Sequence, residues 1–99
     1  FVGHTHELQL IPISRGDIVR TKLAEGSLEL DENLTYFINV GSVGHPRDGN
    51  GKAKYVLWDS RDGTLQVRGV CYPAHLTAEK IVARGFPKAY AICICPSFK

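Results

Sequence analysis

The stretch Tyr-Phe-Ile-Asn-Val-Gly-Ser-Val-Gly-His-Pro-Arg-Asp-Gly at positions 36–49 joins a strand signal directly to a glycine-rich segment. Its first three residues are aromatic or β-branched and predict a central strand of a sheet. Residues 41–54 contain four glycines and Pro46 and predict a long loop. Long loops in small domains often carry function, so we expect a functional loop at the end of this strand.

This loop has two interpretations. Glycine-rich turns after strands expose backbone N–H groups that can hold a phosphate or a carboxylate, and Arg47 could add a bidentate contact. The alternative is a structural turn in which Asn39 and Ser42 bond to local backbone and Arg47 pairs with Asp48. Spacing alone favours the structural turn. No Gly-Lys-Ser or Gly-Lys-Thr follows, so the loop is not a nucleotide-binding phosphate loop.

Short strands lie on both sides of this stretch, and helix signals gather near the end of the chain. Alternating or β-branched runs predict strands at residues 8–14, 18–30 (one or two strands), 55–58 and 65–68, with residues 1–3 as the end of another. Asp62-Gly63 predicts a hairpin between the last two strands. Apolar residues at helical spacing predict a helix after Pro73, formed around Ala74, Ala78, Ile81 and Val82. Residues 87–95 could form a helix or a strand, and their propensities favour a strand.

The composition fits a single small α/β or β-rich domain. The chain has 99 residues, of which 43% are hydrophobic and 22% are charged, so disorder is not expected. No apolar run approaches the roughly 20 residues of a membrane span. A net charge of +2 without a basic cluster gives no nucleic-acid signature. We expect Tyr55 and Trp58 to lie in the core.

The chain has three cysteines, Cys71, Cys93 and Cys95. An odd number without framework spacing argues against a disulfide scaffold and favours a reducing compartment, the cytoplasm. Cys93 and Cys95 lie in an apolar run, where we expect small buried hydrophobes. Metal or redox use of these two thiols is the alternative.

Gly3-His4-Thr5-His6 directly follows the first strand end. Residues two apart in an extended backbone point to the same face, so both imidazoles are expected to face one cavity. Neutral imidazole is a common metal ligand, and Gly3 leaves room for a close approach. Alone, a His-x-His pair is a weak signal, and surface or capping histidines are the more frequent outcome. We expect His75, at the start of the predicted helix, to be a solvated surface residue.

Taken together, the two motifs resemble those of the calcineurin-like metallophosphoesterases. The resemblance is to small bacterial-type members whose late motifs read Gly-His-Thr-His and Asn-Pro-Gly-Ser-Val-Gly-Gln-Pro-Arg-Asp, here residues 3–6 and 39–48. A Tyr before the last predicted helix (Tyr72) and a Gly-x-Pro after it (residues 85–87) also fit, so the resemblance covers essentially the whole chain. Val40 and His45 depart from the pattern, replacing the usual Pro and Gln.

The resemblance implies a four-layer α/β sandwich, of which residues 1–99 form the C-terminal portion, mostly strands with one or two C-terminal helices. It implies hydrolysis of a small-molecule phosphoester at a centre of two divalent metal ions (Mn, Ni, Zn, Fe or Mg), which activate a water as nucleophile. His4 and His6 would ligate the metals, and the chain would hold no catalytic residue. Asn39, Ser42 and Arg47 would wall the site. The family's earlier Asp, Asn and His motifs do not occur here, so the chain alone is expected to be inactive.

The chain contains no Met and starts at Phe1, which we interpret as either a processed product or a piece of a longer one. A sheet cut from a larger sandwich exposes an apolar face and a strand edge, so we expect the isolated chain to self-associate. The alternative to an enzyme is a non-catalytic scaffold or interaction module with a metallophosphoesterase-like fold.

Overall fold

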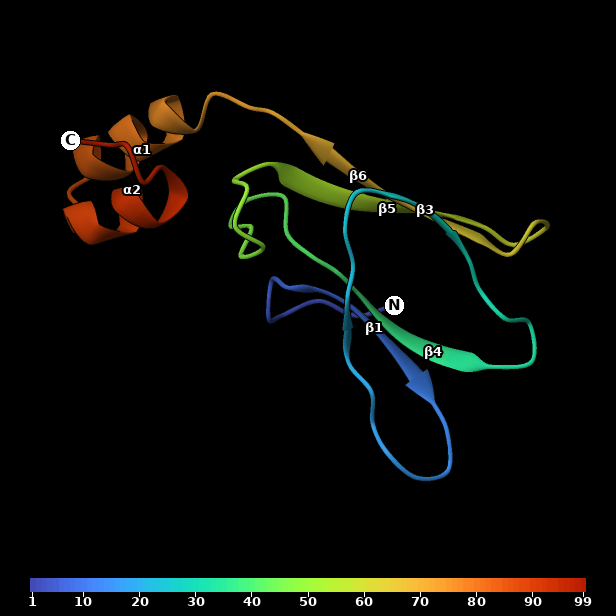
Figure 1. The fold of residues 1–99 in the computed structure, drawn as a ribbon. Coiled ribbons are helices and arrows are strands. Elements are labelled where there is room, and N and C mark those ends of the chain that lie inside the picture. The colour runs from blue at the N-terminus through green and yellow to red at the C-terminus, as the bar shows by residue number, and fades with distance from the viewer.

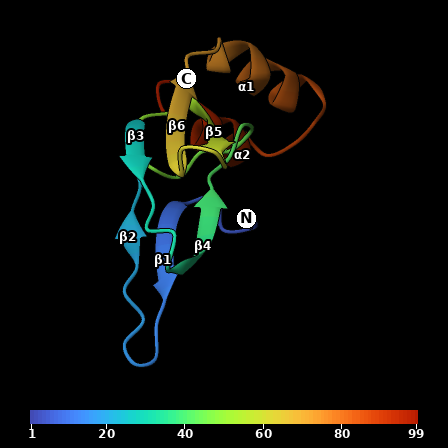
Figure 2. The same cartoon turned by 90° about the vertical axis from the view of Figure 1, so that its right-hand side faces the viewer.

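The computed structural model describes residues 1–99 and contains six strands and two helices. The elements follow in the order β1 (Leu8–Ile13), β2 (Thr21–Lys22), β3 (Gly26–Glu29), β4 (Thr35–Val40), β5 (Ala53–Asp59), β6 (Thr64–Val70), α1 (Ala74–Ala83) and α2 (Lys88–Ile94). All strand pairs are antiparallel and form two three-stranded sheets, ordered β2-β1-β4 and β3-β6-β5 (Figure 1, Figure 2). The expected combination of many strands with C-terminal helices is confirmed.

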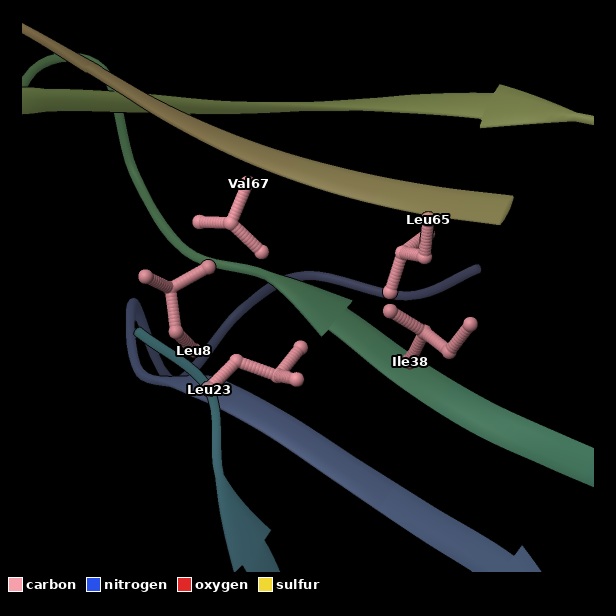
Figure 3. Close-up of a cluster of buried hydrophobic side chains, with 5 residues drawn as sticks. All are labelled: Leu8, Leu23, Ile38, Leu65 and Val67. Atoms are coloured by element: carbon pink, nitrogen blue, oxygen red, sulfur yellow. The ribbon is translucent and has the colours of Figure 1, made fainter. Parts of the chain in front are cut away.

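The main core lies between the two sheets. Leu8, Leu23 and Ile38 from the side of the first sheet point toward Leu65 and Val67 of β6 (Figure 3). Leu65 is fully buried because β6 is the central strand of its sheet, and the two-residue period of a strand brings Val67 to the same face. The core is small, since only 10 of the 99 residues are buried.

Helices α1 and α2 pack against each other at one end of the molecule (Figure 1). Small side chains form their contact, with Ala78, Ala91 and Cys95 buried between them. The radius of gyration is 16.2 Å, against roughly 13 Å for a compact domain of this length. The molecule is therefore elongated, and much apolar surface on the helices and the sheets stays exposed. Neither helix is long and apolar enough to cross a bilayer.

Several local predictions are confirmed. Strands β5 and β6 form the expected hairpin, whose turn contains Asp62-Gly63 with a φ of 63° at the glycine. The glycine-rich stretch after β4 is a loop that reaches to β5. Helix α1 begins after Pro73 and ends before Gly85, as the apolar spacing predicts, and His75 is exposed on it.

The strand expected at residues 87–95 is wrong, because Lys88–Ile94 form helix α2. Ala91 and Cys95 are four residues apart and share the face that packs on α1, and this contact overrides the strand propensity of the isoleucines. Cys93 lies on the opposite face and is exposed, so its expected burial is also wrong, whereas that of Cys95 is confirmed.

Two further expectations about the sheets are wrong. Strand β4 pairs with β1 on one side only, and on its other side it meets a single bridge from Val2, so it is not a central strand. Tyr55 and Trp58 are 37% and 43% exposed rather than in the core. Tyr55 points to the outer face of its sheet, and Trp58 lines an open hollow of about 570 Å³ at the end of the sandwich that carries the β5–β6 turn.

Candidate functional site

His4 and His6 lie in a tight turn between the Val2 bridge and β1. Both residues have positive φ, 81° at His4 and 64° at His6. The Thr5 N–H donates to the Gly3 carbonyl at 3.1 Å, so His4 is the central residue of a three-residue turn. The extended backbone expected here is therefore wrong. Left-handed conformations cost non-glycine residues free energy and persist only where surrounding contacts hold them.

Asn39 supplies those contacts from the end of β4. Its side chain is buried, and its amide nitrogen donates to the Gly3 carbonyl at 3.0 Å and to the Thr5 hydroxyl at 2.8 Å. Its amide oxygen accepts from the Gly41 N–H at 3.1 Å. Val2 adds two backbone hydrogen bonds to β4. Asn39 thus fixes the turn that carries both histidines, and all its bonds are to protein groups rather than to an open cavity.

The glycine-rich loop orients the His6 ring. His6 Nδ1 lies 3.0 Å from the His45 carbonyl oxygen. A carbonyl oxygen only accepts, so Nδ1 carries the proton, and the neutral imidazole keeps its lone pair on Nε2. The His45 N–H in turn donates to the Ser42 hydroxyl at 2.9 Å. The rings of His6 and His45 meet edge to face, with centroids 5.6 Å apart. Ser42 therefore acts on His6 through His45.

Arg47 contacts the same turn only through its backbone, whose N–H donates to the His6 carbonyl at 3.3 Å. Its side chain is exposed and makes no ion pair. The expected pairing with Asp48 is wrong, because Asp48 pairs with Lys54 at 2.9 Å. The Arg47 guanidinium is thus free to meet an anion. A groove of about 380 Å³ lies beside it, lined by Glu7, Leu8, Gln9, Lys22, Leu23, Arg47, Asp48 and Gly49.

The histidines fit part of a metal site. A ligating His typically donates its second ring N–H to a carbonyl or carboxylate, as His6 does to His45. No group of three or more His, Cys, Asp and Glu side chains in the chain could hold a metal ion. Since a divalent metal site uses roughly three or four protein ligands, His4 and His6 can supply only a part of one.

Comparison with known proteins places the fold. No family model matches the chain. A crystal structure of a metallophosphoesterase from Sphaerobacter thermophilus superimposes with a TM-score of 0.80 at 24% identity, over 93% of this chain and 39% of that one. The fold is that of the C-terminal α/β portion of a metallophosphoesterase. An uncharacterized protein of Methanocaldococcus jannaschii is 41% identical over 88 residues, 89% of this chain and 35% of the relative. The chain thus spans about a third of that relative's length.

Within this metallophosphoesterase-like fold, the sequence missed two residues of the site. Thr5 accepts a hydrogen bond from the Asn39 side chain, which clamps the histidine turn through its bonds to Gly3 and Thr5. The only sequence signal for Thr5 is its place between the two histidines. Lys54 is 2% exposed and bonds to the glycine-rich loop from β5. Lys54 and Val56 are two residues apart on one strand and therefore face the same side of the sheet, and Asp48 and Asn50 lie shortly upstream. This combination is the sequence signal that could have identified Lys54.

Proposed function

We propose that this chain contributes His4 and His6 as ligands to a centre of two divalent metal ions in a metal-dependent phosphoesterase. The observation that supports this most directly is the orientation of His6, whose Nδ1–H is held by the His45 carbonyl and whose Nε2 lone pair is left for a metal. Positive φ at both histidines adds to it, because strained backbone clusters at ligand sites. The likeness of the fold to a metallophosphoesterase supplies the reaction class.

Bound divalent ions would lower the pKa of a water and neutralise phosphoryl charge during hydrolysis of a phosphoester. The chain's own residues bind and orient. The Asn39 clamp keeps the two imidazoles in one turn, and the His45 carbonyl keeps His6 in one tautomer. The free guanidinium of Arg47 is suited to a bidentate contact with a phosphoryl group of the substrate. The remaining ligands and the catalytic acid would come from outside residues 1–99.

The test is metal-dependent hydrolysis of a generic phosphodiester and a phosphomonoester by the intact protein with added Mn²⁺. His4→Ala and His6→Ala are each expected to abolish turnover. His75→Ala is the matched control, since His75 is exposed on α1 and outside the site, and it is expected to retain full activity. Wild-type rates in both site variants would refute the ligand assignment.

The isolated 99-residue chain is a second arm of the same assay. Two imidazoles do not complete a metal centre, so we expect no turnover above background with Mn²⁺. Turnover at an ordinary enzymatic rate would contradict this. If the intact protein shows no hydrolysis at all, the scaffold function becomes the better interpretation.

A further inference from the structure

Lys54 carries a buried positive charge that the proposed chemistry does not use. Its side chain is 1% exposed. The ammonium bonds to the Asp48 carboxylate, with the two oxygens at 3.1 and 2.9 Å, and to the Lys52 carbonyl at 2.7 Å. The Asn50 side-chain oxygen is a third partner. A buried ammonium is tolerated only when its N–H groups are paired, so these three residues are held around Nζ.

The same loop is attached to the histidine turn at its other end. The His45 carbonyl accepts from His6 Nδ1 at 3.0 Å, and the Arg47 N–H donates to the His6 carbonyl at 3.3 Å. Only Pro46 and Arg47 lie between His45 and Asp48, and Asp48 is the first residue that Lys54 holds. The groups that orient His6 therefore sit directly next to the groups that Lys54 anchors.

The loop needs such an anchor. Gly49 and Gly51 both have positive φ, and Gly44 is also in the loop. Glycine loses more conformational freedom on ordering than any other residue, so a glycine-rich loop stays in one conformation only when bonds hold it. Few apolar contacts are available, because residues 47–51 are all exposed. Lys54 is the only side chain that bonds three separate residues of the loop, Asp48, Asn50 and Lys52.

We propose that Lys54 is a positioning residue for the metal ligand His6. It holds residues 48–52, and through them it keeps the His45 carbonyl against His6 Nδ1. This inference rests on the proposed function, in which His6 ligates a metal through Nε2. Loss of an outer partner of a ligating histidine typically lowers metal affinity by about 10–100-fold, so removal of the Lys54 ammonium is expected to weaken metal binding by about tenfold.

The test compares Lys54→Met with Lys52→Met in the intact protein. Met preserves the length of the side chain and removes its charge. Lys52 is the matched control, because its exposed ammonium pairs with Glu25 and its anchoring group is a backbone carbonyl that the substitution leaves in place. Two quantities are measured: the ¹⁵N chemical shifts of the His6 imidazole without metal, and the Mn²⁺ affinity by titration calorimetry.

In the wild type and in Lys52→Met, the ¹⁵N shifts are expected to report a single Nδ1–H tautomer of His6. In Lys54→Met, they are expected to report a mixture of tautomers, with Mn²⁺ affinity about tenfold lower. A folded Lys54→Met protein with an unchanged tautomer and unchanged affinity overturns the proposal, as does an equal change in Lys52→Met.

Asn50→Ala keeps the test decisive if Lys54→Met fails to fold. It removes one of the loop's bonds to the ammonium, together with the hydrogen bond that the Lys52 N–H donates to Asn50, and leaves the ion pair with Asp48 in place. A smaller shift of the tautomer in the same direction is expected, and no shift overturns the proposal. The tautomer does not depend on metal. A wild type that binds no Mn²⁺ would therefore refute the proposed function, while the role of Lys54 in orienting His6 would still be decided by the ¹⁵N shifts.

Discussion

Replacing Asn39 with Ala should release the turn that carries both histidines. The substitution removes three hydrogen bonds, to the Gly3 carbonyl, the Thr5 hydroxyl and the Gly41 N–H. At a net value of about 1 kcal/mol each, their loss amounts to about 3 kcal/mol. Gly3 and Thr5 are exposed, so water replaces part of this.

Release of the turn also returns free energy to the variant. His4 and His6 each hold a left-handed backbone, which costs about 1–2 kcal/mol per residue for a residue with a side chain. The free energy of this strain is comparable to that of the hydrogen bonds that Asn39 makes. Without those bonds nothing offsets the strain, so the backbone of the turn is expected to relax to negative φ. Since about 2–4 kcal/mol of strain is released against about 3 kcal/mol of lost bonds, we expect a net loss of at most about 1 kcal/mol in the free energy of unfolding, together with loss of the positive-φ geometry at both histidines.

The free energy of unfolding is measured by urea titration, followed by the fluorescence of Trp58, the only tryptophan. The backbone of His4 and His6 is followed by the intraresidue HN–Hα NOE, which is strong at positive φ. The variant Asn39→Asp distinguishes the hydrogen bond to Gly41 from the one to Gly3. It keeps an acceptor for the Gly41 N–H, but it places an oxygen against the Gly3 carbonyl where the wild type has an N–H donor. Unchanged NOEs at both histidines in Asn39→Ala, or a loss of about 3 kcal/mol or more, would refute the reasoning.

Gly41→Ala is expected to lower the free energy of unfolding by about 2–4 kcal/mol, because φ there is positive and a Cβ would lie 3.0 Å from the Leu8 side chain. Gly49 shares the positive φ, but a Cβ there would meet open space, so urea titration should show a smaller loss of unfolding free energy for Gly49→Ala. Equal losses in the two variants would contradict the contribution assigned to the contact with Leu8. A hydrogen bond to Glu25, reinforced by its charge, raises the pKa of Lys52 above 10.5. The stability that wild type gains over Glu25→Gln should therefore be fully present below pH 10.5 and disappear as the pH rises through the raised pKa; a difference that persists at higher pH would contradict this. Because large apolar side chains are exposed over both sheets and both helices, light scattering should show the mass of the isolated chain rising with concentration, and a constant monomer mass would count against self-association.

Most strands could be predicted from the sequence because their signals are local. The β5–β6 hairpin follows from Asp62-Gly63 between two alternating runs, and α1 follows from apolar spacing between Pro73 and Gly85. Helix α2 could not be predicted from propensity, since its isoleucines and Tyr90 favour strands. What decides it is the contact of Ala91 and Cys95 with α1, which depends on how the two helices meet.

The site shows the same limit more sharply. The sequence singled out the His-Thr-His segment and the glycine-rich loop as candidate site segments, and the structure brings them together through His6 and His45. The local period of a strand gave the wrong backbone at His4, because the conformation there is imposed by Asn39, 35 residues later in the chain. Spacing rules describe neighbours in sequence and contain no information on such a distant clamp.

The two anchors of the site belong to different sheets. Asn39 lies on β4 and holds the histidine turn, whereas Lys54 lies on β5 and holds the glycine-rich loop that joins these two strands. The hydrogen bond between His6 and the His45 carbonyl spans the turn and the loop, so its length depends on how the sheets stack. Leu8, which packs between the sheets, also lies directly under Gly41 at the start of the loop. A change that shifts one sheet against the other is therefore expected to alter the orientation of His6, even when it touches neither His6 nor His45.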